Sequence, residues 1–208
     1  MSHEVLTKDE DLLAYSEKAH LLIDVKLPLE YLKRSKVVVY RAKDGRILAG
    51  YCIAMAPPFR SLMPVPDDFK REVSTSLQSV IEINGVWVEP RHRRGILALN
   101  LCFSLTKDLF RSGKSNYLYS YSAHKTRLSQ FYAKAKPRRI WCGDVYIDGM
   151  DRPDREVVEV VHRTNLLPFV LKNIFAKGIH AISRRGRKSV RQVDHSRIAS
   201  RLIGQKYS

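Results

Sequence analysis

A basic turn between a strand pattern and a helix pattern carries the clearest chemical signal in the sequence. The strand pattern ends at Val88-Glu89-Pro90, and Arg91-His92-Arg93-Arg94-Gly95 leads directly into an apolar helix pattern over Ile96–Phe110. The first turn of a helix leaves backbone N–H groups without intrahelical partners, and the helix dipole favours an anion beside them. The arginines add positive charge, and the glycine lets the backbone approach closely. The pattern predicts a phosphate-binding turn, with a solvated basic turn as the alternative.

Alternating patterns on both sides of this turn predict the sheet that must hold it. Lys36–Arg41 and Arg46–Met55 flank a tight turn at Asp44-Gly45, which indicates a β-hairpin. Ser79–Glu89 predicts a strand, and Asn84-Gly85 within it indicates a bulge. Downstream, the patterns predict strands over Tyr117–Ser122, Arg139–Ile147 and Arg155–His162, and helices over Lys125–Lys136 and Thr164–Ala176.

The N-terminal segment predicts two helices. Thr7-Lys8-Asp9-Glu10 is similar to a capping box, and Leu12, Leu13, Ser16 and Ala19 then fall on one helical face. A second, short helix is expected over Pro28–Arg34. A hairpin followed by alternating strands and helices predicts an α/β class with a mixed sheet and helices packed on it.

The residues around the basic turn resemble the acyl-donor site of the GNAT acyltransferases. Val88-x-Pro90-x-x-Arg93-x-x-x-x-Ala98 is similar to the Val-x-Pro strand end and Arg-x-x-Gly-x-Gly/Ala loop of that family. Leu128-Ser129-Gln130-Phe131-Tyr132 is similar to its second signature, a helix with a Phe-Tyr pair. Ile96 stands where the family has its first loop glycine, and Ser122-Ala123-His124 stands where an asparagine is usual.

The resemblance implies a fold and a reaction. The fold is a GNAT-like domain over residues 1–178, with a mixed, mostly antiparallel central sheet that is splayed in the middle and flanked by helices. The reaction is direct transfer of an acyl group from acyl-CoA or acyl carrier protein to the amine of a small acceptor such as an amino acid. A weaker resemblance extends to N-acyl amino acid synthases and acyl-homoserine lactone synthases, which share this fold. The donor is then a co-substrate, and no tightly bound cofactor or metal is expected.

The resemblance also assigns roles to residues. Tyr132 matches the residue that protonates the departing thiolate, and Glu82 is the preferred general base, with Glu89 and His92 as alternatives. Each also has a purely structural interpretation, as a solvated carboxylate or a packed aromatic. Trp87 is either a core residue or a wall of the acyl tunnel. The expected donor-binding residues are Val86, Trp87, Val88, Arg93, Arg94, Gly95, Ile96, Leu97 and Ala98.

The charge balance favours anionic partners. The 208 residues contain 37 Lys and Arg against 21 Asp and Glu, a formal charge of +16, within an otherwise ordinary globular composition. An acidic acyl carrier protein fits this surface through electrostatic steering. Residues 179–208 form a predicted basic tail. The rival hypothesis is a non-catalytic nucleic-acid-binding protein that uses this tail and the aromatic and basic residues of Arg111–Arg139.

Cysteine usage and hydropathy predict the compartment. Cys52, Cys102 and Cys142 lie in apolar segments without metal-binding spacing, so buried free thiols are expected. Their odd number and the polar first ten residues favour a reducing cytoplasm, and no apolar run approaches a membrane span. The motifs of serine hydrolases, P-loop nucleotide hydrolases and zinc proteases do not occur in the sequence.

Overall fold

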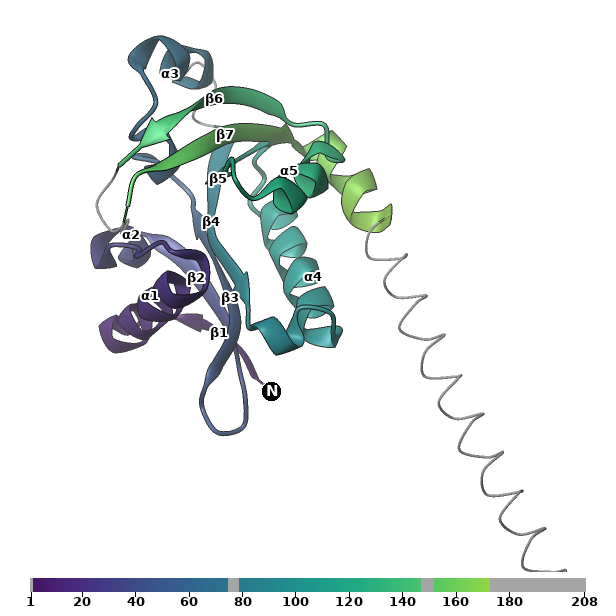
Figure 1. Cartoon of the computed structure of the whole chain (residues 1–208). Helices are drawn as coiled ribbons and strands as arrows, with labels where there is room; N and C mark the ends of the chain where they lie inside the picture. Colours follow the sequence, from purple (N-terminus) through teal and green to yellow (C-terminus); the bar gives the residue numbers. More distant parts are fainter. Residues whose placement is uncertain (1, 75–78, 147–151, 173–208) are drawn as a thin grey trace, which may run out of the picture. The chain divides into compact units, whose positions relative to one another are not determined.

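The computed structural model describes residues 2–74, 79–146 and 152–172, and in these ranges it shows a seven-stranded sheet with helices on both faces (Figure 1). The seven strands and every helix labelled below lie within the compact unit Met1–Val170. The strand order is β1-β2-β3-β4-β5-β7-β6, and each neighbouring pair is antiparallel except β4 with β5. The strands are β1 (Ser2–Leu6), β2 (Ser35–Arg41), β3 (Ile47–Ala54), β4 (Val80–Val88), β5 (Asn116–Ser122), β6 (Arg138–Val145) and β7 (Asp154–His162).

Strand alternation divides the core between the two faces of the sheet. Different helices cover the two faces (Figure 1). Val37 and Val39 of β2 belong to the cluster beneath α1 (Asp9–Ile23) and α2 (Leu29–Lys33), which we call the α1 face. Val38 belongs to the cluster beneath α4 (Ile96–Arg111) and α5 (Thr126–Ala133), the α4 face. The other helical segments are α3 (Asp67–Ser74), the 3₁₀ turns η1 (Arg60–Leu62) and η3 (Pro90–His92), and residues 163–172.

Most predicted elements are confirmed, and the differences lie mainly near the N-terminus. Strand β1 was not predicted. The α1 helix begins after Lys8, with no side-chain cap bond, so the predicted capping box at Thr7 is wrong. Tyr15, with no exposed surface, takes the core position expected for Leu13, which is 45% exposed. The predicted basic tail and the end of the last predicted helix lie outside the described residues.

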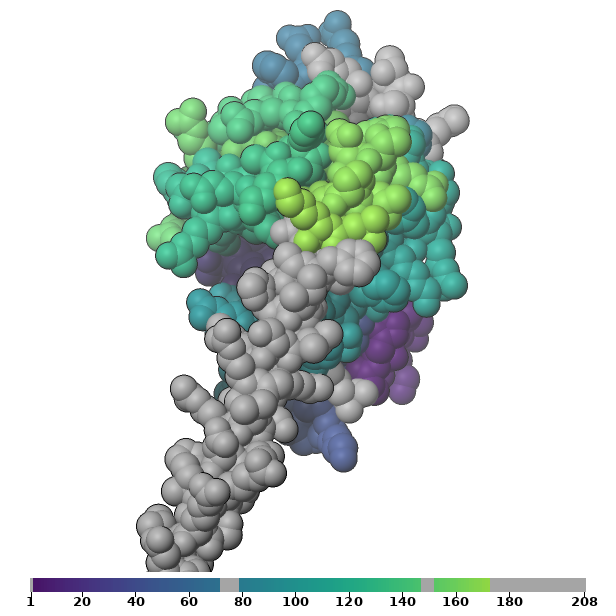
Figure 2. Space-filling view, turned by 90° about the vertical axis from the view of Figure 1, so that its right-hand side faces the viewer, coloured from purple at the N-terminus to yellow at the C-terminus, as the bar shows by residue number. Residues whose placement is uncertain are grey.

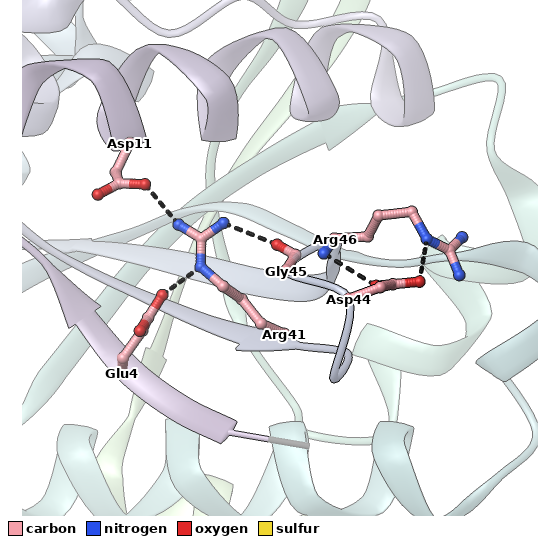
Figure 3. Close-up of polar contacts among 6 residues, drawn as sticks. All are labelled: Glu4, Asp11, Arg41, Asp44, Gly45 and Arg46. Atoms are coloured by element: carbon pink, nitrogen blue, oxygen red, sulfur yellow. Dashed lines mark hydrogen bonds and ion pairs between the residues drawn. The ribbon is translucent and has the colours of Figure 1, made fainter.

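Arg41 ties the edge strand to its neighbours (Figure 3). Its guanidinium donates to the carboxylate of Glu4 on β1, to Asp11 Oδ1 on α1 at 2.6 Å, and to the carbonyl of Gly45 in the hairpin turn at 3.0 Å. Its pKa is raised, first of all by the hydrogen bond to Glu4. The planar guanidinium can bridge three partners in this way because its N–H groups form a fixed fork.

Tyrosine hydroxyls fix α4 on the sheet. Tyr40 donates to the carbonyl of Asn100 at 3.0 Å, Tyr51 to Asp108 Oδ2 at 2.8 Å, and Tyr117 to the carbonyl of Leu109 at 3.3 Å. These three tyrosines come from β2, β3 and β5. Because the bonds are spaced along the helix, they set its position along its own axis as well as its distance from the sheet.

The sheet divides after the third residue of β4. The parallel pairing of β4 with β5 covers only Val80–Glu82 against Asn116–Leu118. Beyond it, β4 continues along β3 and β5 continues along β7. We call the divergence between Ile83–Val88 and Tyr119–Ser122 the wedge. The predicted splay in the middle of the sheet is therefore confirmed.

A bulge held by α1 accompanies the divergence. Cys52 pairs with Asn84 and Gly50 with Trp87, so two residues of β4 lie opposite Tyr51 alone. The predicted bulge at Asn84-Gly85 is thus confirmed. Gly85 has φ +57°, and its carbonyl accepts a 2.6 Å hydrogen bond from the buried hydroxyl of Tyr15.

We expect Gly85→Ala to lower the free energy of unfolding by about 2 to 4 kcal/mol, since a left-handed backbone and overpacking add up. A Cβ at this position would lie 2.5 Å from Tyr15 Oη and 2.9 Å from Leu27 Cδ1. Gly113→Ala is the matched control, because Gly113 has φ +71° and its Cβ would meet nothing within 4 Å. Urea unfolding of both variants measures the difference. Equal losses would contradict the packing of Tyr15 against the bulge.

Candidate active site

The basic turn places uncapped amides at the end of β4. The amides of His92, Arg93 and Gly95 bond to carbonyls within the turn, at 2.9, 3.4 and 3.1 Å. Gly95 is the N-cap of α4 and supplies no side-chain cap. The first-turn amides, those of Ile96, Leu97 and Ala98, are therefore the donors that the helix start can offer to an anion.

The side chains around these amides differ in their roles. Arg91, Arg93 and Arg94 are exposed, but the Arg93 Nε also donates to the carbonyl of Val88 at 3.1 Å. Ile96 is 64% exposed, whereas Leu97 is buried in the core of the α4 face. Arg93 thus fastens the turn to the strand, and Arg91 and Arg94 extend from the same turn.

The last residues of β4 face the wedge with their backbone. The amide of Glu89 bonds to the carbonyl of Leu48 on β3 at 2.9 Å. Alternate residues of a strand direct their N–H and C=O groups to opposite neighbours, so those of Val88 point toward the wedge. Val86 is 36% exposed, while Trp87 is 3% exposed and stacks on Tyr15 at 5.9 Å. Trp87 therefore occupies the core of the α1 face.

Glu82 lies where β4 leaves β5, and it is fully buried. Its Oε2 accepts hydrogen bonds from the Tyr31 hydroxyl at 2.8 Å and the Arg60 amide at 2.9 Å, and its Oε1 accepts one from the Ser61 amide at 2.6 Å. The solvated-carboxylate interpretation of Glu82 is therefore wrong. Burial, then the charge of Glu82, raises the pKa of the Tyr31 hydroxyl.

A cavity of about 640 Å³ is lined in part by Tyr31 and Arg60, two residues that donate hydrogen bonds to Glu82, although the buried Glu82 side chain is not itself part of the lining. Lys33 and Arg34 also line it, together with Pro58 and Met63. Arg34 lies over the Tyr31 ring at 5.0 Å and donates to the carbonyl of Ala56 at 3.1 Å. The cavity thus has charged and apolar walls, in which Lys33 forms a 3.4 Å ion pair with Glu30, another lining residue.

Further polar groups on the α1 face were missed by sequence analysis. The Ser61 hydroxyl donates to Ser120 on β5 at 3.3 Å. Glu156 on β7 is buried, and burial raises its pKa, while a hydrogen bond to Ser120 and the charge of Arg60 oppose that shift. Segments far apart in the sequence meet here, so no local motif marks these residues.

Tyr132 lies on the α4 face, opposite Glu82. Its ring packs against Tyr119 at 4.7 Å and Tyr121 at 5.3 Å, both on the half of β5 that borders the wedge. Burial, followed by nearby charges, raises the pKa of its hydroxyl to about 12. Tyr132 is therefore protonated at neutral pH, as a proton donor must be. Glu159 on β7, which sequence analysis missed, accepts bonds from the hydroxyls of Tyr119 and Tyr121.

The alternative bases have other partners. Glu89 is 7% exposed and forms a 2.9 Å ion pair with Lys18 of α1, and the hydrogen bond to Lys18 lowers its pKa. His92 is half-buried in η3. Neither Lys18 nor the turn η3 lines the cavity, whereas Glu82 bonds to Tyr31 and Arg60, which do.

The aromatic residues of the rival nucleic-acid hypothesis face the interior. Tyr117, Tyr119 and Tyr121 are 0%, 6% and 6% exposed, so they form no stacking surface. Figure 2 shows the face that carries α4 and α5, drawn in teal and green. Basic side chains are exposed around α5 and β6, namely Lys125, Arg127, Lys134, Lys136, Arg138 and Arg139.

Among the described helices, none is long and apolar enough to cross a membrane.

Strand β4 diverges from β5, and an uncapped helix start follows β4 after the turn η3. The chain shares its fold, the GNAT fold, with solved acyltransferase structures. No family model and no curated protein matches the sequence. The similarity to solved structures is therefore one of fold.

Three solved structures illustrate this similarity. FeeM, an N-acyl amino acid synthase from uncultured soil microbes, superposes with a TM-score of 0.56 at 8% identity, over 78% of this chain and 92% of its own. A ribosomal-protein-alanine N-acetyltransferase from Brucella melitensis gives 0.51 at 13% identity, over 78% and 99%. The yncA protein from Salmonella typhimurium, solved with its cofactor acetyl-CoA, gives 0.50 at 13% identity, over 78% and 94%.

The cysteines, which are not in disulfides, provide a test of the packing at the bulge. Cys102 is exposed, which corrects the expectation of three buried thiols, and Cys52 is fully buried opposite Asn84. Burial raises the pKa of the Cys52 thiol to about 12. At pH 8 we expect a thiol reagent to label Cys102 rapidly and Cys52 only after unfolding. Mass spectrometry of labelled peptides measures both, with Cys102→Ser as the control. Rapid labelling of Cys52 in the native protein would contradict the closed bulge.

Proposed function

We propose that this protein is an N-acyltransferase that moves an acyl group from a thioester donor to the amine of a small acceptor. The wedge is the observation that carries the proposal. It is bordered by the backbone of Val88, it ends at the uncapped start of α4, and it begins at Glu82. Structures of the same fold include one solved with acetyl-CoA, which supports a thioester donor.

On the donor side, the amides of Ile96, Leu97 and Ala98 hold the phosphate of the donor, and Arg91 and Arg94 attract it. The extended arm of the donor then lies along the wedge, and the Val88 N–H pairs with it or polarises the thioester carbonyl. The exposed Ile96 makes this turn unlike a glycine-rich phosphate loop. Both acyl-CoA and acyl carrier protein present a phosphopantetheine arm to such a site.

On the acceptor side, the cavity beside Tyr31 and Arg60 receives the amine substrate, such as an amino acid. The amine attacks the thioester carbonyl, Glu82 takes the proton that the nitrogen loses, and Tyr132 gives a proton to the departing sulfur. Glu82 and Tyr132 face opposite sides of the sheet. The wedge is the place in the sheet where the two substrates can meet.

We propose that an acidic acyl carrier protein delivers the acyl group. The exposed cations around α5 and β6 have the charge that such a partner requires, and FeeM, which shares the fold, is an N-acyl amino acid synthase. Acyl-CoA is the alternative donor. Among the described residues, the buried tyrosines of β5 give no support to nucleic-acid binding.

Native mass spectrometry with a panel of acyl-CoAs and acyl carrier proteins tests the donor. We expect either the acyl-CoAs or the acyl carrier proteins to bind. The double variant Arg91→Ala with Arg94→Ala should weaken that binding by about tenfold or more, since two charge-assisted contacts to phosphate are lost. Arg71→Ala, on the distant α3, removes a similar charge and serves as the control. Absence of any thioester complex would contradict the proposal. Oligonucleotide binding at physiological salt without thioester turnover would favour the rival class.

Single-turnover kinetics test the proton donor. Tyr132→Phe keeps the ring contacts with Tyr119 and Tyr121 but removes the hydroxyl. We expect kcat to fall by about 10- to 100-fold, while the Kd of the donor stays unchanged, because the proton is needed only when the carbon–sulfur bond breaks. An unchanged kcat would remove Tyr132 from the mechanism.

A further inference from the structure

A buried carboxylate on β7 organises the aromatic residues beside the wedge. Glu159 is 5% exposed, and it pairs directly with Tyr119 across the ladder between β5 and β7. Its Oε2 accepts a hydrogen bond from the Tyr119 hydroxyl at 3.1 Å, and its Oε1 accepts one at 3.2 Å from the Tyr121 hydroxyl, which also bonds to Ser129 Oγ at the longer distance of 3.4 Å. Arg139 lies 3.7 Å from Oε1, with a side chain that is 59% exposed.

The two bonds lock both phenol rings in place. Tyr119 and Tyr121 lie two residues apart on β5, and their rings stack with centroids 6.3 Å apart. The ring of Tyr132 packs against both of them, and Phe131 packs against Tyr132 at 5.7 Å. A freely rotating phenol at either position would leave Tyr132 without a fixed surface.

A carboxylate is a costly choice for such a position. Burying a charge is unfavourable unless hydrogen bonds and a counter-charge compensate it, and here two phenols and a 3.7 Å ion pair with the largely exposed Arg139 supply that compensation. A neutral amide has only one accepting oxygen, so it cannot accept from both tyrosines with separate atoms. The carboxylate is thus matched to the task of holding two phenols at once.

We propose that Glu159 is a positioning residue that holds the ring of Tyr132 at the border of the wedge through the phenols of Tyr119 and Tyr121. The proposal rests on the proposed function, in which Tyr132 donates the proton to the departing sulfur. Glu159 touches neither substrate in this scheme. It fixes the direction of the Tyr132 hydroxyl, and its charge opposes ionisation of that hydroxyl.

The charge of Glu159 gives a readout that does not depend on turnover. Burial is the main cause of the raised pKa of Tyr132, and the carboxylate of Glu159 adds to it. In protein labelled with ¹³C at tyrosine Cζ, the Tyr132 signal is assigned with Tyr132→Phe and titrated against pH. We expect Glu159→Gln to move this titration down by less than about half a pH unit, because the carboxylate adds to the raised pKa of Tyr132 after burial and after the nearby Cys102 and Tyr121.

Glu156→Gln is the matched control for the titration. Glu156 is a second buried carboxylate of β7, but it lies on the α1 face, where it bonds to Ser120. Glu156→Gln also removes a buried charge from β7. If general destabilisation alone moved the Tyr132 titration, the titration would therefore shift in both variants. We expect it to leave that titration unchanged.

Kinetics connect the titration to the reaction. We expect Glu159→Gln to lower kcat by about tenfold with KM for the donor changed by less than about twofold, as for loss of an interaction made only in the transition state. Tyr121→Phe, which removes one of the two phenol donors and keeps the ring, should lower kcat by a smaller factor. It also serves as the second variant if Glu159→Gln does not fold.

The outcomes distinguish failure of the positioning role of Glu159 from failure of the proposed acyltransferase function. A shifted Tyr132 titration with the expected fall in kcat supports the proposal. A shifted titration in a protein without thioester turnover supports the positioning of Tyr132 and contradicts the proposed function. An unshifted titration in Glu159→Gln, or an equal shift in Glu156→Gln, overturns the role of Glu159. If Glu159→Gln does not fold, an unchanged Tyr132 titration and an unchanged kcat in Tyr121→Phe overturn it.

Discussion

The hydrogen bond between Tyr15 and the carbonyl of Gly85 is the contact on which the rest of the site depends. A sheet gains backbone hydrogen bonds by pairing its strands along their full length, so strands that part in the middle need a compensating constraint. Here the bulge turns β4 away from β5, and a helix on the α1 face supplies the hydroxyl that satisfies the bulged carbonyl. The absence of a side chain at Gly85 makes room for the Tyr15 hydroxyl.

The two faces of the sheet carry different parts of the candidate site. On the α4 face, tyrosines from three strands fix α4, whose uncapped start lies at the end of β4. On the α1 face, backbone amides of η1 and the hydroxyl of Tyr31 hold Glu82, and Tyr31 and Arg60 also line a cavity. The turn and the cavity, which we propose bind the donor and the acceptor, are thus built from separate parts of the chain.

The sequence predicts the parts of this architecture whose signals are local. Strong periodicity predicts the hairpin and α4, and Asn84-Gly85 predicts the bulge, because these features depend on neighbouring residues. The edge strand β1 is short and largely exposed, so its pattern does not differ from that of a polar terminus. The donors of Glu82 and the phenol partners of Glu159 come from positions 21 to 51 residues away, so they follow only from tertiary pairing.

The clamp formed by Arg41 has a consequence for how the molecule avoids aggregation. Without β1, the edge of the sheet would be β2, whose Val37-Val38-Val39-Tyr40 is a β-prone, uncharged run of the kind that recruits other strands. The strand that covers it is short and carries Glu4, and Arg41 fastens that glutamate in register. Strand β1 therefore shields an aggregation-prone strand edge. Loss of the Arg41 contacts would expose β2 and favour self-association while the core remained folded.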